Sequence, residues 1–282
     1  MRLKNTTQAI TLFLLLLLFA AGCNDHTVDP ITANCRLTEI TGAYIDGTKS
    51  TFEYDANGRV SRQIRSFGTN GADGTFSYKH TYDASGKLSR SDIQNFDGDG
   101  KVVSEAIETY TWANNQIVRF NYEENTGYKG VNNLTYNASG QLIGFTFEFN
   151  DPATDAKWAY SYDANGVVTR RLLTSLDGAN LIFEARLTYT TKELVKTAFS
   201  LMPKAGQPVD LILSRPWETV YPKNDGTIAY YFPDANGQPE VFAKGNLTGM
   251  TFTQSGIATS WSYRDIVGDL TSPVRFQING CQ

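Results

Sequence analysis

The sequence predicts an all-β protein, an antiparallel up-and-down meander of repeated hairpins that curls into a large barrel or a wrapped sheet. A five-residue turn phrase recurs at Tyr54–Gly58, Tyr82–Gly86, Tyr136–Gly140 and Tyr162–Gly166. A repeated turn indicates that one structural unit stacks on copies of itself. Most copies are followed by a stretch that alternates between apolar and polar residues, which is typical of half-buried strands.

The turn phrase carries its own chemistry. Asp or Asn follows the aromatic residue and can open a turn by bonding the backbone ahead of it. Asn-Gly or Ser-Gly then supplies the positive φ that hairpin turns need. We therefore expect positive φ angles at the four glycines of the phrase: Gly58, Gly86, Gly140 and Gly166.

Period-two alternation assigns the side chains of each strand to faces of the sheet. We expect four sets to share a face: Phe52 with Tyr54; Val60 with Arg62 and Ile64; Val118 with Phe120 and Tyr122; and Phe145 with Phe147 and Phe149.

The spacing of the turns predicts the size of the sheet. A copy of the phrase in the opposite phase, Phe96–Gly100, falls between the copies that begin at Tyr82 and Trp112. Turn signals therefore recur about every 14 residues, which predicts roughly 14 to 18 strands. So many strands do not stay in one flat open sheet, so we expect the sheet to curl, close or stack. The proline-rich segment Pro203–Pro222 breaks the rhythm and is predicted to be a long loop.

The first residues indicate export. Arg2 and Lys4 precede the apolar segment Ala9–Ala21, which is short for a membrane span. The boundary Phe19–Cys23 resembles the bacterial lipoprotein signal, which implies removal of residues 1–22 and acylation of Cys23. The alternative is an ordinary secretory signal. We expect residues 23–34 to be a flexible tether, residues 35–282 to be a single β domain, and the lipid to anchor it without a membrane span.

Composition excludes some functions. Without residues 1–22, the chain has 23 basic and 29 acidic side chains, a net charge of −6. A mildly acidic chain without basic runs is not typical of a nucleic-acid-binding protein. Its histidines are His26 and His80, too few for a multi-histidine zinc site, and His80 is expected on the sheet surface.

The phrase Tyr54–Val60 and its sister copies resemble the YD repeats of Rhs-type proteins. Together with the Phe19–Cys23 boundary, they make the chain similar to Bacteroidota lipoproteins of unknown function that carry a YD-like domain with a porin-like β fold. The resemblance covers about Thr51 to Gly178, with degraded copies to about Gly256. It implies an outer-membrane lipoprotein, and it offers no established catalytic residues.

Two kinds of polar site can be considered. Paired carboxylates could form a glycosidase site, with candidates Glu105, Glu108, Glu148 and Glu184. The segment Asn95–Gly100 matches the first half of a calcium loop, with oxygen ligands at Asn95, Asp97 and Asp99. Its twelfth position is Ala106 where such a loop has a glutamate, and the segment also fits the turn phrase, so a plain hairpin turn is favoured.

Aromatic residues are abundant and regularly placed. One series precedes equivalent turns and is predicted to form a ladder near one end of the sheet: Tyr54, Tyr82, Trp112, Tyr136 and Tyr162. Cross-strand packing is the simpler interpretation. The functional alternative is a stacking platform for sugars, with Trp112, Trp158, Trp217 and Trp261 as candidates.

The sequence as a whole favours a non-catalytic binding or scaffold module for a glycan, a peptide or an envelope partner, without a cofactor. The alternative is an exported hydrolase that uses paired carboxylates. A membrane pore is disfavoured because strands such as Ser61–Ser66 are too charged for a lipid-facing band.

Two cysteines remain if Cys23 carries lipid. Cys35 and Cys281 lie near the two ends of the β domain, and an exported protein meets an oxidising environment. They are predicted to form a disulfide if the first and last strands meet. The alternative is that both thiols stay reduced.

Overall fold

The structure is a computed structural model. It describes residues 35–42, 49–68, 71–150, 152–189, 194–196, 220–222, 226–254, 257–265 and 271–280. Arg36–Asn279 form one compact unit, and residues 1–35 with 280–282 form another. Cys23, the tether, residues 203–219 of the proline-rich segment and Cys281 lie outside the described residues. Cys35 is buried and disulfide-bonded.

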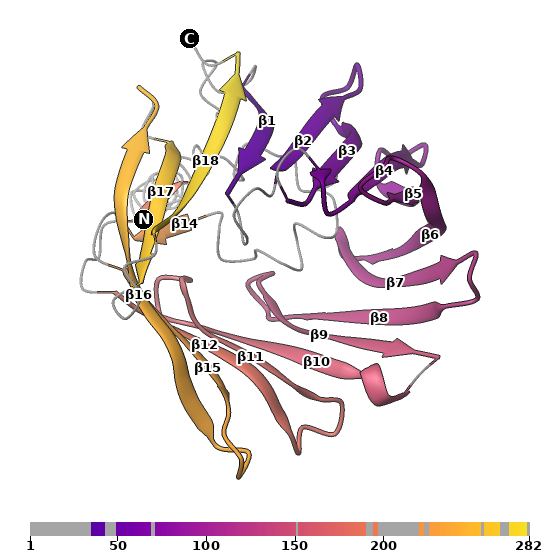
Figure 1. Ribbon diagram of the computed structural model, residues 1–282. Helices are drawn as coiled ribbons and strands as arrows, with labels where there is room; N and C mark the ends of the chain where they lie inside the picture. Colours follow the sequence, from indigo (N-terminus) through magenta and orange to yellow (C-terminus); the bar gives the residue numbers. More distant parts are fainter. Residues whose placement is uncertain are drawn as a thin grey trace, which may run out of the picture. The chain divides into compact units, whose positions relative to one another are not determined.

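The described part of the larger unit is almost entirely strand, as predicted (Figure 1). The strands are β1 (Arg36–Thr41), β2 (Lys49–Tyr54), β3 (Val60–Ser66), β4 (Thr75–Tyr82), β5 (Leu88–Phe96), β6 (Val102–Ala113), β7 (Gln116–Glu124), β8 (Lys129–Tyr136), β9 (Leu142–Phe149), β10 (Ala156–Tyr162), β11 (Val168–Ser175), β12 (Leu181–Tyr189), β13 (Leu194–Lys196), β14 (Val220–Pro222), β15 (Gly226–Pro233), β16 (Pro239–Phe252), β17 (Ala258–Asp265) and β18 (Thr271–Asn279). One short 3-10 helix, η2 (Pro152–Thr154), lies between β9 and β10. No helix among the described residues is long and apolar enough to span a membrane.

The strand pairing confirms the predicted antiparallel meander. Each strand from β1 to β12 pairs with the next, β12 pairs with β15, and β15 to β18 pair in order. Ile40 of β1 pairs with Ser50 of β2 on one side and with Phe276 of β18 on the other. The short strands β13 and β14 pair with each other in a separate two-stranded sheet. Residues 220–222 of the proline-rich segment are therefore strand, whereas a loop was predicted there.

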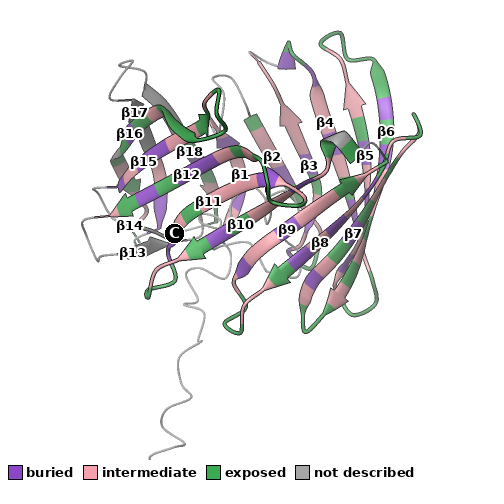
Figure 2. Cartoon of the chain, turned by 90° about the horizontal axis from the view of Figure 1, so that it is seen from below, coloured by how far each residue is buried: buried purple, intermediate pink, exposed green. Residues whose placement is uncertain are grey.

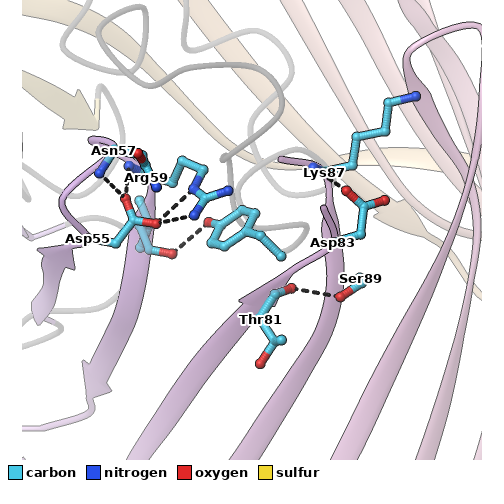
Figure 3. A network of polar contacts seen from close by, with 9 residues as sticks. Asp55, Asn57, Arg59, Thr81, Asp83, Lys87 and Ser89 are labelled. Atoms are coloured by element: carbon cyan, nitrogen blue, oxygen red, sulfur yellow. Dashed lines mark hydrogen bonds and ion pairs between the residues drawn. The ribbon is translucent and has the colours of Figure 1, made fainter. Parts of the chain in front are cut away.

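The turns have the predicted chemistry. Asp55 Oδ1 accepts hydrogen bonds from the backbone N–H groups of Asn57 and Arg59, each at 2.9 Å (Figure 3). The same bonds recur at Asp83, Asn137 and Asp163. The four glycines of the phrase have φ angles between 76° and 82°, which confirms the expected left-handed positions.

A β-bulge follows the turn between β2 and β3, and it corrects a face assignment made from the sequence. The register shifts by one residue just after Val60, which leaves Ser61 as the extra residue of the bulge. The alternation moves by one position, so Gln63 joins Val60 on the buried face. Arg62 is exposed and Ile64 is half-buried, so neither shares the face of Val60 as predicted.

The same bulge recurs between β6 and β7. Val118 is the extra residue there, and Ile117 takes its predicted place beside Phe120 and Tyr122. By contrast, the predicted set of three phenylalanines on β9 is confirmed, because neighbouring rings lie 5.9 Å apart along one face of the strand.

The predicted aromatic ladder exists, and hydrogen bonds hold it in place. Tyr82 donates its hydroxyl hydrogen to the carbonyl of Val60 at 2.6 Å, and Val60 is the second residue after the glycine of the preceding turn. Three further bonds of 2.5 to 2.8 Å follow the same rule: Trp112 to Leu88, Tyr162 to Leu142 and Tyr189 to Val168. Two more bonds of the ladder reach carbonyls that do not follow a turn glycine, from Tyr54 to Leu37 at 2.6 Å and from Tyr136 to Ile117 at 2.9 Å. Burial raises the pKa of Tyr136 to about 12, so its hydroxyl stays a donor.

Three basic residues of the ladder rim, Arg36, Arg59 and Lys87, also lie over the aromatic ring of a neighbouring hairpin. The Arg59 guanidinium forms an ion pair with Asp55 at 2.6 Å and lies 4.3 Å from the centre of the Tyr82 ring. Arg36 lies over Tyr54 and Lys87 over Trp112 in the same way. Cations over aromatic faces contribute roughly 0.5–1 kcal/mol each when exposed. Tyr54, Tyr82 and Trp112 are thus held to the neighbouring hairpin both by a hydrogen bond and by a cation over the ring.

Because the strands are antiparallel, the turns gather at two rims of the sheet. We call the rim with the aromatic ladder, at residues 55–59, 83–87, 113–116, 137–141 and 163–167, the ladder rim. The far rim holds the turns at residues 67–74, 97–101, 124–128, 175–180 and 234–238. Exposed large apolar side chains among the described residues all flank turns of the far rim: Val102, Val103, Ile182, Phe232, Val241 and Phe242.

Buried and exposed residues alternate along the strands, so the sheet has two different faces (Figure 2). We call them the aromatic face, which bears Tyr82, Phe120 and Phe145, and the polar face, which bears Arg62 and Glu105. The core clusters of buried apolar residues lie on the aromatic face. Any recognition of an apolar ligand by the described residues is therefore a property of the aromatic face or of the far rim.

Candidate functional site

The aromatic face contains a hollow of about 360 Å³ across β6, β7, β8 and β9. Two polar side chains, Glu108 and Asn132, line it together with six aromatic ones: Phe120, Tyr122, Tyr128, Phe145, Phe147 and Phe149. A mostly apolar hollow with a few polar groups is the usual form of a small-ligand site.

The floor of the hollow depends on a glycine. Gly130 on β8 pairs with Phe149 on β9, and a Cβ atom on Gly130 would lie 2.4 Å from Cδ1 of the Phe149 ring. The ring therefore lies over the glycine backbone. The Tyr128 ring stacks on the Phe149 ring, with the ring centres 4.8 Å apart and an interplanar angle of 24°. A larger residue at position 130 would displace Phe149 and remove the floor.

A buried polar chain leads to the wall of the hollow. His80 on β4, Ser91 on β5 and Tyr110 on β6 are linked by contacts of 2.8 Å and 2.7 Å, and Tyr110 donates its hydroxyl hydrogen to Glu108. Since the Glu108 carboxylate can only accept, Ser91 donates to Tyr110 and accepts from Nδ1 of His80. The chain fixes the position of Glu108.

This position of His80 corrects a prediction, because the sequence placed it on the sheet surface. The residue is buried on the aromatic face, where its ring stacks on Tyr78 at 6.3 Å. The signal was present in the sequence, since period two places His80 on the same face as Tyr78 and Tyr82.

Tyr122 is a permanent hydrogen-bond donor at the edge of the hollow. Burial, together with the negative charges of Glu124 and Glu108, raises its pKa to about 12. Its hydroxyl group is therefore neutral at every physiological pH. With Glu108 and Asn132 it gives the hollow donors and acceptors around an apolar floor.

The four carboxylates of the hydrolase alternative do not converge. Glu108 lines the aromatic hollow, whereas Glu105 on the polar face accepts a bond from Gln94 and Glu148 one from Asn133. The fourth, Glu184, lies on β12 and is treated next.

Glu184 is 1% exposed, and its Oε1 atom accepts hydrogen bonds from the Nε–H groups of Arg170 and Arg186, each at 2.6 Å. Burial raises its pKa, but the bonds from Arg186 and Arg170 outweigh this and hold the pKa below its usual range. A general acid needs a raised pKa. Glu184 is thus suited to a structural ion pair.

The calcium candidate serves as a hairpin turn. Asp97 Oδ1 accepts from the backbone N–H of Asp99 at 3.1 Å and of Lys101 at 2.9 Å, as Asp55 does in its own turn. Asn95 pairs with Ser104 within the sheet. Among the described residues, no three His, Cys, Asp or Glu side chains are grouped so that they could hold a metal ion.

The tryptophan candidates divide between the two roles that the sequence left open. Trp112 belongs to the ladder, where its Nε1–H bonds the backbone. Trp158 lies on the aromatic face beside Phe145, and the Arg171 guanidinium lies 4.0 Å from its ring centre. Trp217 and the side chain of Trp261 lie outside the described residues.

A second hollow, of about 650 Å³, lies on the polar face across β4 to β7. Its charged lining residues are Lys79, Arg90, Asp92, Glu105, Glu123 and Glu124, so it is acidic on balance. Arg90 forms an ion pair with Asp92 at 2.5 Å, and Glu123 forms one at 2.5 Å with Lys129, which does not line the hollow. The aromatic hollow, with its mostly apolar lining and few polar groups, is the better candidate site.

Comparison with known proteins adds a likeness of fold. No model of a known protein family matches the chain, and no curated protein matches its sequence. A porin-like protein from Bacteroides uniformis is 15% identical, with a TM-score of 0.53 over 86% of this chain and 98% of that one. At this identity the likeness concerns the fold alone.

Two further likenesses are weaker. A porin-like protein from Bacteroides vulgatus is 9% identical over 86% of this chain and 98% of its own, with a TM-score of 0.38. The TcdB2–TccC3 structure is 11% identical and matches 82% of this chain with 12% of its own length, at a TM-score of 0.33. The shared fold, a large antiparallel β-sheet, rests on the porin-like protein from Bacteroides uniformis.

Proposed function

We propose that this protein is a lipid-anchored, non-catalytic binding module of the bacterial envelope, and that its aromatic hollow binds a glycan. The observation that carries the proposal is the composition of the hollow, in which aromatic rings form the floor and Glu108, Asn132 and Tyr122 provide polar groups around it. A sugar ring has an apolar face of C–H groups and an edge of hydroxyl groups. Aromatic floors with polar walls complement both parts of such a ligand.

The test is a glycan array probed with the purified full chain, followed by titration of the glycans that bind. Glu108→Gln should weaken binding about tenfold or more, because bonds to a charged acceptor are lost and each contributes roughly 1.5–3 kcal/mol. The matched control is Glu148→Gln, on the polar face of β9. Equal affinities of the two variants would contradict the proposed site. Release of new reducing ends from a bound glycan would instead support the exported hydrolase.

We place the protein at the outer membrane through acylation of Cys23. The Phe19–Cys23 boundary supports this placement, and the likeness to porin-like Bacteroides proteins agrees with an envelope location. Cys23→Ala should abolish incorporation of a palmitate analogue and release the protein from the membrane fraction. Equal labelling of the variant and the wild type would remove the lipid anchor from the proposal.

We also infer that the sheet is closed into a barrel at β1 and that a disulfide between Cys35 and Cys281 fastens this seam. The pairing of β1 with both β2 and β18 supports closure, and Cys35, at the start of β1, is disulfide-bonded. For a disulfide that closes so long a loop, chain entropy limits its contribution to the free energy of unfolding to roughly 5 kcal/mol. Mass spectrometry of the non-reduced protein should find the Cys35–Cys281 peptide pair, and free thiols at both positions would contradict it.

A further inference from the structure

The aromatic rings of the hollow continue as a line across β9 to β16. The contacts between ring centres are 6.3 Å from Phe145 to Trp158, 5.9 Å from Trp158 to Phe183, 5.4 Å from Phe183 to Phe232 and 5.1 Å from Phe232 to Phe242. We call these five residues the aromatic track. It begins inside the hollow at Phe145 and ends on the β15–β16 hairpin, which projects at the lower left of Figure 1.

The exposure of the track increases along its length. Phe145 is 7% exposed, Trp158 and Phe183 are half-buried, Phe232 is 42% exposed and Phe242 is 74% exposed. All the rings of a hydrophobic core would be buried. The aromatic track instead runs from the hollow to solvent at the far rim, so its outer rings are accessible to a ligand.

A charged side chain strengthens the middle of the track. The Arg171 guanidinium on β11 lies 4.0 Å from the ring centre of Trp158 on β10 and 5.9 Å from that of Phe183 on β12. It therefore bridges two rings that are separated by one strand. A guanidinium stacked in this way also places hydrogen-bond donors between apolar surfaces.

We propose that the ligand is a linear oligosaccharide of several units, with one end in the hollow and the remainder along the aromatic track towards Phe242. This inference rests on the proposed function, because it assumes that the hollow binds a sugar. A row of flat rings can stack successive sugar units. Glu108 in the hollow and Arg171 beside the track can form hydrogen bonds with sugar hydroxyl groups. A lipid tail would bury these polar groups without hydrogen-bond partners, which is unfavourable.

The charge of the far rim also disfavours an anionic membrane as the partner of the track. Asp234 and Glu240 belong to the same hairpin as Phe232 and Phe242. Acidic groups beside the exposed rings would be repelled by anionic lipid head groups. A neutral sugar chain meets no such repulsion.

The test is the dependence of affinity on chain length. The full chain is titrated with malto-, cello- and chito-oligosaccharides, each from one to six units, and the affinity of the series that binds should rise with length. Phe242→Ala should weaken binding of the six-unit sugar about three- to tenfold and leave the one-unit sugar unaffected. Val103→Ala is the control, since it truncates an exposed apolar residue of the same rim on β6, away from the track.

The outcomes separate the two proposals. Glu108→Gln should weaken binding of short and long sugars alike. Affinity that does not depend on length, or an unchanged six-unit affinity in Phe242→Ala, overturns the track while the hollow stands. Failure of all three series and of the array to bind overturns both. Unchanged thermal melts of Phe242→Ala and Val103→Ala confirm that the variants are folded.

Discussion

The turn at Asp55–Val60 and the turn at Asp97–Val102 share a local structure but have different surroundings. Both aspartates accept two backbone N–H bonds, and Gly58 and Gly100 have φ angles of 76° and 78°. Yet Val60, on the ladder rim, is 0% exposed and Val102, on the far rim, is 40% exposed.

The difference has two causes. Val60 pairs with Tyr54 on the aromatic face, whereas Val102 pairs with Phe96 on the polar face. The neighbouring hairpins also differ: at Gly58, a Cβ atom would meet Nη2 of Arg36 at 2.5 Å, whereas at Gly100 it would meet no atom within 4 Å, and Tyr82 bonds the Val60 carbonyl. The comparison teaches that the turn phrase specifies only the hairpin, and that the face of the sheet and the contacts between hairpins decide whether the turn is part of the core.

The largest test of this comparison truncates the residue after the turn. Leu88→Ala on the ladder rim should lower the free energy of unfolding by about 2–5 kcal/mol, because the side chain is fully buried in the core of the aromatic face. Val102→Ala, at the equivalent position of the far rim, should cost less than about 0.5 kcal/mol. Urea unfolding monitored by fluorescence measures both, and similar losses would break the comparison.

The glycines provide a second test. Gly58→Ala and Gly100→Ala both force a side chain into a positive φ angle, which costs about 1 kcal/mol or more. Gly58→Ala should cost more, because the new methyl group also displaces the Arg36 guanidinium from the turn. Thermal melts of the two variants compare them directly. A larger loss in Gly100→Ala would show that Arg36 adds nothing to the ladder rim.

The ladder hydrogen bond gives a third, smaller effect. Tyr82→Phe removes the bond to the Val60 carbonyl and leaves a buried acceptor, so it should lower the free energy of unfolding by about 1 kcal/mol. Tyr128→Phe on the far rim, where the ring stacks on Phe149, is the control and should change stability by a few tenths of a kcal/mol. If both variants melt at the wild-type temperature, the ladder is held by ring packing alone.

The smallest effect concerns acid pH. Burial raises the pKa of Asp55, but hydrogen bonds from Arg59 and Asn57 and the Arg59 charge outweigh this and lower it below 3.8. A carboxylate with a lowered folded-state pKa contributes stability that is present above its unfolded pKa and is lost as the pH falls through the folded value.

The expected difference in unfolding free energy between wild type and Asp55→Asn is therefore below about 1 kcal/mol at pH 6, and it should vanish towards pH 2. The control is Asp97→Asn. Asp97 accepts the backbone N–H of Lys101 in the same kind of turn, so this variant is compared with the loss of the Asp55–Arg59 ion pair. Unfolding curves at several pH values provide the measurement. A difference that grows as the pH falls would have the wrong sign for this mechanism.

Much of the fold could be predicted from local signals. The Asp-to-glycine turn phrase predicted the left-handed glycines, and period two predicted the common face of Phe145, Phe147 and Phe149. The bulges could not be predicted, because the bulged residues Ser61 and Val118 share no side-chain property and the register shift arises between strands.

The candidate site was even less accessible from the sequence. Its floor depends on the pairing of Gly130 with Phe149, and its wall depends on the chain from His80 through Ser91 to Glu108. Both arise between residues of different strands, and one sequence does not show the register that brings them together. The abundance of aromatic residues was visible, but their exposure was not.

The bond between hairpins also has a consequence for how such a chain can change in length. Each ladder hairpin offers its neighbours the same two surfaces, an aromatic N–H or O–H donor on one side and a backbone carbonyl on the other. The carbonyl belongs to the main chain, so its presence does not depend on the side chain at that position. Duplication or loss of a whole hairpin therefore leaves matching surfaces on both sides of the junction. The gene can widen or narrow the sheet in steps of one hairpin without creating a new kind of contact.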